Sequence, residues 1–202
     1  MQEQAGRRVG AYEIIGEVGR AGMGTVHLAR QVNLRRNVAL NELSALHAGD
    51  PAVASRFVRE ARLAASLNHP AVVAEHESLE HDGVPYIAME YLARGSLRPW
   101  IGCLTTAPVG GVLIDALEGL THAHQHGVVH RDLKPEHLLV TDGGRVAIAD
   151  LGIAKLIDCA TSAYPATATG TPLGTPAYLA HEHAPAAGPE SEAVREKQCE
   201  RW

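Results

Sequence analysis

Lysine is almost missing from the first two thirds of this 202-residue sequence. Of the 18 basic residues only three are lysines, Lys134, Lys155 and Lys197, and the other 15 are arginines. The first 133 residues therefore contain no lysine. Any chemistry that needs an amine in that stretch must use another group, and a planar guanidinium is not an equivalent replacement.

Positive charge and long apolar runs are also scarce. The net charge of −5 argues against a nucleic-acid binder that depends on a broad basic face. No apolar run approaches the ~18–20 residues needed to cross a bilayer, so no membrane segment is predicted. The first residues, MQEQAGRRVGAYE, have neither the apolar stretch nor the cleavage site of a secretory signal. We therefore expect a cytoplasmic protein.

Cysteine is rare and widely spaced. The three cysteines, Cys103, Cys159 and Cys199, form no CxxC pair. Their odd number and wide spacing argue against a disulfide framework and against a structural zinc site. With 46% hydrophobic residues the chain can nevertheless bury a sizeable core.

The pattern of the remaining sequence predicts an α+β fold in two lobes. Strands with one helix come first, and a break near residues 91–95 precedes a long helix and two short strands. Asp50 and Pro51 predict the start of the first helix, as N-cap and first helical residue. The expected strands are a pair within 12–30 around a glycine cluster, then 37–43, 71–77, 84–91, HLLV and RVAIA; the expected helices run from 51 to a stop at 68–70 and over 109–126.

The segment VVHRDLKPEHLLV is the most informative motif. It places an acid, Asp132, a base, Lys134, and a metal-ligating side chain, His137, on one loop. A second acid, Asp150, follows the next expected strand. Two acids at the ends of neighbouring strands can hold a divalent cation and deprotonate a hydroxyl group.

These motifs, with the glycine cluster, VALN and GTPAY in the same order, resemble the bacterial eukaryotic-like serine/threonine protein kinases over about residues 12–182. The resemblance implies a two-lobe kinase fold. Residues 12–92 would form an N-lobe with an antiparallel sheet and one helix. Residues 93–182 would form a helical, incomplete C-lobe, and 183–202 a disordered tail. It also implies ATP and Mg²⁺ as cofactors and a protein substrate with a serine or threonine hydroxyl.

The resemblance also assigns roles to single residues. Asp132 would orient the substrate hydroxyl and accept its proton, Lys134 would neutralise the transferring phosphoryl group, and Asp150 would bind the metal. Thr175 would belong to the loop that receives the protein substrate. The residues implied in ATP binding are Gly19, Gly22 and Gly24 of the phosphate loop, Val26, Ala39, Asn41, Glu60, Met89, Glu90, Leu92 and Leu139.

Four departures from the family pattern fall on the chemistry. Ala21 replaces the second glycine of the phosphate loop, where Gly22 is expected to absorb the change. Asn41 replaces the lysine that would contact the α- and β-phosphates, and Glu60 thereby loses its partner. His137 replaces an asparagine metal ligand, which favours Mn²⁺ over Mg²⁺.

The fourth departure is the end of the chain. The sequence stops twenty residues after Ala180-His181-Glu182, so an apolar part of the C-lobe is expected to be exposed and to need a partner that covers it. Two functions follow as alternatives. One is a serine/threonine protein kinase with impaired transfer. The other is a pseudokinase or truncated nucleotide- or protein-binding module without turnover.

A histidine group near the end of the second helix allows two interpretations. His122 and His126 share a helical face and could bind a metal ion. Alternatively, they are polar residues at a helix C-terminus, where they complement the helix dipole. The sequence favours the second interpretation.

Overall fold

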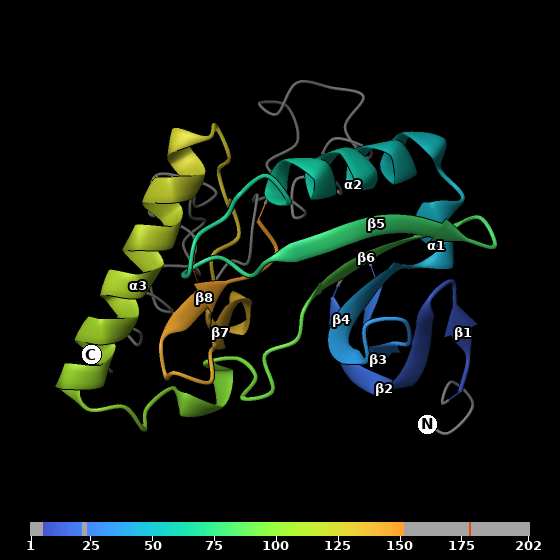
Figure 1. The fold of residues 1–202 in the computed structure, drawn as a ribbon. Helices are drawn as coiled ribbons and strands as arrows, with labels where there is room; N and C mark the ends of the chain where they lie inside the picture. The colour runs from blue at the N-terminus through green and yellow to red at the C-terminus, as the bar shows by residue number, and fades with distance from the viewer. Residues whose placement is uncertain (1–5, 22–23, 152–177, 179–202) are drawn as a thin grey trace, which may run out of the picture.

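The computed structural model describes residues 6–21, 24–151 and Tyr178. The first part of the chain forms one six-stranded antiparallel sheet with the strand order β1-β2-β3-β4-β6-β5. Helix α2 runs across one face of this sheet (Figure 1). The elements are β1 (Arg8–Val9), β2 (Tyr12–Ala21), β3 (Gly24–Gln31), β4 (Arg36–Leu43), α1 (Ala45–Ala48), α2 (Pro51–Ala64), β5 (Glu75–His81) and β6 (Val84–Glu90).

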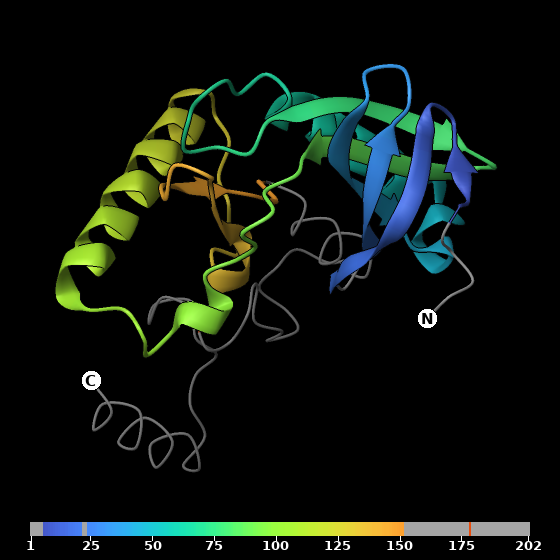
Figure 2. The same cartoon turned by 60° about the horizontal axis from the view of Figure 1, so that its bottom comes forward.

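The second part contains one long helix and a two-stranded sheet. In both ribbon views β7 and β8 lie between the long helix α3 and the six-stranded sheet (Figures 1 and 2). This two-part α+β arrangement agrees with the sequence prediction. The elements are η1 (Arg98–Trp100), α3 (Thr106–Gln125), η2 (Pro135–His137), β7 (Leu138–Val140) and β8 (Val146–Ile148).

Strand β4 shows why the sheet has two buried faces. Its alternate side chains point to opposite sides, as the period of two in a strand requires. Val38 and Leu40 join a cluster on one face with Tyr12 and Ile14, whereas Ala39 and Leu43 join the cluster under α2. The apolar run that identified this strand therefore reflects burial on both sides.

Helix α2 begins as predicted. The Asp50 carboxylate accepts hydrogen bonds from the amides of Ala52 and Val53, and Pro51 occupies the first turn, where a missing N–H costs nothing. Phe57 and Ala61, four residues apart, turn toward the sheet. The helix ends at Ala64, four residues before the predicted stop.

The segment after α2 corrects one predicted strand. We expected a strand over 71–77, but β5 begins only at Glu75. The preceding residues are used differently: the Val73 amide donates to the Ile148 carbonyl oxygen at 2.9 Å, and the Ile148 amide donates to the Ala71 carbonyl oxygen at 2.9 Å. This seam joins the first part of the chain to β8.

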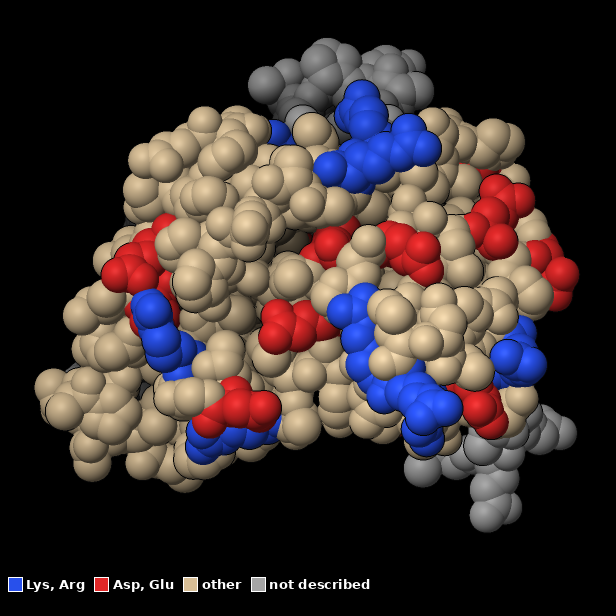
Figure 3. Space-filling model, viewed as in Figure 1, with Lys and Arg blue, Asp and Glu red and all other residues tan. Residues whose placement is uncertain are grey.

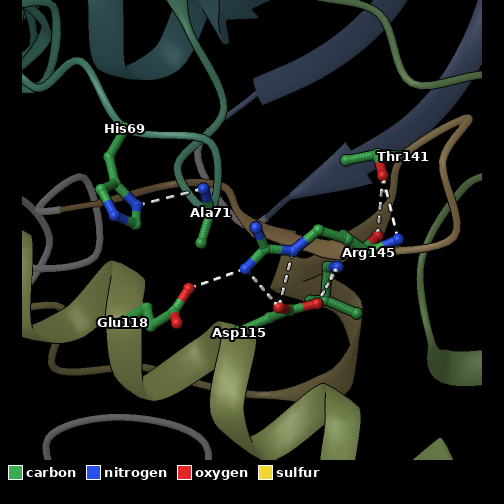
Figure 4. Close-up of polar contacts among 7 residues, drawn as sticks. His69, Ala71, Asp115, Glu118, Thr141 and Arg145 are labelled. Atoms are coloured by element: carbon green, nitrogen blue, oxygen red, sulfur yellow. Dashed lines mark hydrogen bonds and ion pairs between the residues drawn. The ribbon is translucent and has the colours of Figure 1, made fainter.

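Helix α3 docks closely on this seam. It begins at Thr106, three residues before the predicted start. A Cβ at Gly119 would lie 2.5 Å from the Ala71 carbonyl oxygen, so only glycine permits this approach. Asp115 fixes the other end of the contact, because its carboxylate accepts bonds from the Arg145 guanidinium and from the Val146 amide (Figure 4).

The opposite face of α3 is apolar and exposed. The side chains of Val109, Leu113, Ile114 and Leu117 are 39%, 56%, 59% and 61% exposed. Exposed apolar surface in the C-lobe is also an expectation drawn from the sequence. Among the described helices, none is long and apolar enough to span a membrane.

Charged side chains are distributed in small areas of both signs. On the face drawn in Figure 3, basic side chains gather over α2 and acidic side chains lie along the middle. No single sign covers this face.

Candidate active site

A cleft of about 750 Å³ lies between the six-stranded sheet and β7–β8. Most of the residues predicted to bind ATP line it, and they come from both parts of the chain. Gly22 and Thr175 lie outside the described residues, as does the side chain of Glu60 on α2. The predicted residues that line the cleft are Gly19, Val26, Ala39, Met89, Glu90, Leu92, Lys134, His137, Leu139 and Asp150.

The roof of the cleft is built by β2, β3 and β4. Gly24 begins β3 where the backbones come very close, because a Cβ there would lie 2.0 Å from the Glu42 carbonyl oxygen. A Cβ at Gly19, in contrast, would meet no atom within 4 Å. The glycine at 24 is therefore required by packing, whereas Gly19 leaves open space where a ligand would approach.

Asn41 lies on the cleft face of the sheet, next to residues of the lining. It shares the register row of Val26 and Ile87 and is only 6% exposed. Its Oδ1 lies near Gly24, 3.4 Å from the position of a Cβ at that residue. The neutral amide is therefore buried beside Gly24, at the position where the family resemblance implies a cation.

Arg20 and Lys134 are the cationic residues among those described as lining the cleft. Arg20 pairs with Glu17 at 2.8 Å, and its side chain is 74% exposed. In the sheet register Arg20 is opposite Thr25, which is opposite Glu42. This row alternates with the row of Val26 and Asn41, which faces the cleft. The Arg20 side chain therefore projects from the other face of the sheet, although the residue borders the cleft.

The floor of the cleft is a connected polar group. The Lys134 ammonium donates to Asp132 Oδ2 at 2.7 Å, and the Asp132 side chain is only 11% exposed. His137 Nδ1 lies 2.8 Å from the Asp132 carbonyl oxygen and donates to it. The Ala149 amide then donates to the His137 carbonyl oxygen at 2.8 Å. The loop that carries Asp132 and the strand before Asp150 are thus held together by backbone contacts.

His130 is a buried support that the sequence analysis did not single out. Its Nε2 donates to the Ala149 carbonyl oxygen at 3.1 Å, and its Nδ1 accepts from the Asp132 amide at 3.4 Å. Burial, followed by the nearby His137, lowers the pKa of His130, so the ring stays neutral as these two bonds require. Its position directly before Arg131 and Asp132 was the available signal.

A corner that fits a cation is formed by His137 and Asp150. His137 Nε2 lies 3.6 Å from Asp150 Oδ2. Because Nδ1 donates to the Asp132 carbonyl oxygen, Nε2 of the neutral ring presents its lone pair. Two ligands of an octahedral ion with bonds of about 2.1 Å are about 3 Å apart, so a small adjustment suffices. Asp150 has a φ of 58°, which aims its carboxylate at this corner at a conformational cost.

Glu75 is an unpredicted acid beside the cleft. It is paired with Met89 in the sheet register, and its Oε2 is buried without a hydrogen-bond partner. Burial, followed by the charge of Asp150, raises the pKa of Glu75 to about 8. The signal in the sequence was a charged residue within the strand predicted over 71–77.

Sequence comparison assigns the chain to a family. The profile of the protein kinase domain family matches residues 12–196. The serine/threonine-protein kinase PknB of Mycobacterium tuberculosis is 40% identical over 180 residues, which are 86% of this chain and 28% of PknB. PrkC of Bacillus subtilis, also a serine/threonine-protein kinase, is 36% identical over 183 residues, or 89% of this chain and 28% of PrkC. The chain thus spans little more than a quarter of these relatives.

Solved structures agree with this assignment. A crystal structure of the PknI kinase domain of Mycobacterium tuberculosis superposes with a TM-score of 0.65 at 31% identity, covering 74% of this chain and 63% of that chain. The chain belongs to the protein kinase family, and its predicted kinase-like fold is confirmed. Its sequence relatives are bacterial serine/threonine protein kinases, a family that uses ATP and a divalent metal.

Proposed function

We propose that this chain binds ATP with a divalent cation in the cleft and transfers phosphate to protein serine or threonine hydroxyls only slowly. One observation carries the proposal: the acidic and basic groups of the floor are present, whereas the position implied for the phosphate-binding lysine holds the buried amide of Asn41.

The walls of the cleft support nucleotide binding. Val26 and Ala39 from the roof and Leu139 from the floor supply apolar surface on opposite sides of a flat slot, which suits a purine ring. The connection at Glu90 and Leu92 supplies backbone polar groups. The Glu90 amide already donates to the Ala74 carbonyl oxygen at 2.8 Å, so an adenine would bond to the other backbone groups of this connection.

The floor supports phosphoryl transfer. Asp132 is placed to orient a substrate hydroxyl and to accept its proton at a carboxylate oxygen. Lys134, beside that carboxylate, is placed to offset negative charge on the transferring group. Asp150 and His137 would hold the metal ion, which when bound neutralises phosphate charge.

The roof limits the rate. A neutral amide cannot supply the charge of an ammonium, and the Asn41 side chain is buried. Losing one preorganised donor of this kind costs about 3–4 kcal/mol, or roughly 10²–10³ in rate. We therefore expect nucleotide binding, driven mainly by the adenine, to survive better than catalysis, with little distinction between ATP and ADP.

A second candidate function is a binding module without turnover. The apolar face of α3 favours it, because an exposed surface of this kind is typical of a protein-interaction site. In this case the cleft would hold a nucleotide as a structural ligand, and the partner that covers α3 would carry the biological effect.

One experiment separates the two candidates. The purified chain is incubated with γ-labelled ATP and a generic basic protein, with D132A as the control, and nucleotide binding is measured in parallel by thermal shift. Slow transfer that D132A abolishes supports the kinase. Binding without transfer above the D132A level supports the module, and absence of nucleotide binding contradicts both.

A further inference from the structure

Three histidine rings gather at the C-terminal end of α3, and none of them lines the cleft. His122 and His126 are one helical turn apart, with ring centroids 4.5 Å apart. His69, from the connection that follows α2, stacks on His122 with a centroid separation of 5.0 Å and an interplanar angle of 24°. The groove beside them has a volume of about 610 Å³ and is lined by His69, Ile114, Leu117, Glu118, Thr121, His122 and Gln125.

The nitrogen atoms of this group are unevenly satisfied. His126 Nδ1 donates to the His122 carbonyl oxygen at 2.8 Å, which leaves the lone pair on His126 Nε2. His122 Nε2 is buried and has no hydrogen-bond partner. His69 Nδ1 accepts from the Ala71 amide at 3.1 Å (Figure 4), so in the neutral ring its Nε2 carries the proton. His126 Nε2 is therefore set up as an acceptor, and His122 Nε2 is the buried ring nitrogen beside it that lacks a partner.

We propose that His122 and His126 form a second metal site, for a divalent transition metal that prefers imidazole, Zn²⁺ foremost. Two imidazoles that share a tetrahedral zinc, with Zn–N bonds of about 2.0–2.1 Å, have ring centroids about 5 Å apart. The observed 4.5 Å is close to that value. A small rotation of the exposed His126 ring would bring its Nε2 toward the same ion as His122 Nε2.

The surroundings define the rest of the site. Among the described residues, no group of three or more His, Cys, Asp or Glu side chains is arranged to hold a metal. Water from the adjoining groove therefore completes the coordination, and the affinity expected of two ligands is micromolar. Burial, followed by the neighbouring His126 and His69, lowers the pKa of His122 and favours the neutral ring that a metal needs. His69 packs on His122 and holds the ring in place.

This site predicts a role that is independent of nucleotide. A metal on His122 and His126 would restrain the last turn of α3. Because His69 stacks on His122, the metal would also restrain the segment at His69, which leads into the hydrogen bonds with β8. We expect one Zn²⁺ per chain to raise the melting temperature without nucleotide.

The test is a Zn²⁺ titration of the complete chain by calorimetry, after chelator treatment and without nucleotide, at pH 7.5. We expect one site of micromolar affinity, weakened at least tenfold in H126Q and in H122N/H126N. H124N is the matched control, because His124 is an exposed histidine of the same helix turn and is expected to leave the affinity unchanged. Circular dichroism checks folding, and H126Q changes an exposed residue, so it remains informative if the double variant unfolds.

Further variants decide between ligand sets. H69N is expected to weaken binding only a few-fold, because His69 packs but does not ligate. A visible Co²⁺ spectrum that is lost in H126Q would support the assignment directly. The proposal is wrong if H126Q binds Zn²⁺ like the parent chain, if binding is lost instead in H137N, or if it is lost in H181N/H183N.

Discussion

The floor and the roof of the cleft differ in the polar and charged side chains that they provide. On the floor, Asp132, Lys134 and His137 are joined by side-chain and backbone hydrogen bonds of 2.7–2.8 Å. On the roof, the backbone approach at Gly24 is preserved, but the side chain that should provide charge is Asn41.

This difference reflects how each half is held. The floor residues lie within a short stretch of chain and are hydrogen-bonded to one another, so a substitution of one alters the positions of the others. In the proposed function, the phosphate contact of the roof would depend on a single side chain at the centre of a sheet. A substitution there leaves strand pairing intact, because Asn41 keeps its register with Val26 and Ile87. The strand pairing of this fold is therefore compatible with a neutral side chain at position 41.

The largest expected effect comes from placing a lysine at position 41 of the roof. N41K is expected to raise phosphate transfer by about 10²-fold or more, because it returns a preorganised positive charge to the phosphates. The measurement is γ-phosphate transfer to a generic basic protein. D132A in the N41K background should remove the gain. If N41K/H137N remains folded and binds ATP yet transfers no faster, the main defect lies outside these two positions.

The next largest effect comes from removing the Asp115 carboxylate, which ties α3 to Arg145 and to the Val146 amide of β8. D115A is expected to lower the free energy of unfolding by about 2–3 kcal/mol, since it leaves the Val146 amide and the Arg145 guanidinium without their acceptor. Burial acts to raise the pKa of Asp115, but these two donors outweigh it and the pKa is lowered. Urea unfolding measures the change.

Glu118 provides the matched control for that variant. It pairs with the same Arg145 at 2.7 Å but is half-exposed, so E118A should cost less than about 1 kcal/mol. Equal losses in D115A and E118A would show that the buried carboxylate has no special role.

A smaller effect concerns the acid beside the cleft. The pKa of Glu75 is raised to about 8 from an ordinary value near 4.5, so between these values the folded state holds a proton that the unfolded state releases. Stability from this group is therefore present at low pH and falls as pH rises toward 8. E75Q should remove that decline and gain about 1–2 kcal/mol on the parent chain between pH 6 and 7.5.

Melting temperatures of both proteins across this pH range measure the effect of Glu75. E80Q, which changes an exposed carboxylate of the same strand, is the control. Parallel curves for E75Q and the parent chain would contradict a buried, protonated Glu75.

The smallest effect is the choice of metal in the cleft. Mn²⁺ accepts imidazole nitrogen more readily than Mg²⁺ does, so nucleotide affinity or transfer should be several-fold higher with Mn²⁺ at equal concentration. H137N should reduce this preference. An identical ratio of the two metals in H137N and the parent chain would remove His137 from the metal site.

Local signals predicted most of the elements. Asp50 and Pro51 located the start of α2, and the turn at 81–83 located the hairpin of β5 and β6. The first strand after α2 was misplaced because Ala71 and Val73 have the apolar character of a strand but bond to β8, far away in the sequence. Periodicity reports burial and does not report which partner provides it.

The candidate site was predicted unevenly for a similar reason. Ordered motifs named most of the cleft lining, including the proximity of His137 to Asp150. They did not specify the bond from His130 to Ala149 or the buried Oε2 of Glu75, because both depend on contacts between segments distant in sequence. The face to which Arg20 belongs also required the strand register.

The seam at Ala71, Val73 and Ile148 has a mechanical consequence. Besides the chain connection at 91–95, this pair of hydrogen bonds ties the segment before β5 directly to β8. An apolar cluster that includes Leu67, Ala123 and Ile148 packs around the same place. The cleft is therefore bordered by a second fixed contact between the two parts of the chain, so a variant that cuts the seam would loosen how the floor is held against the roof.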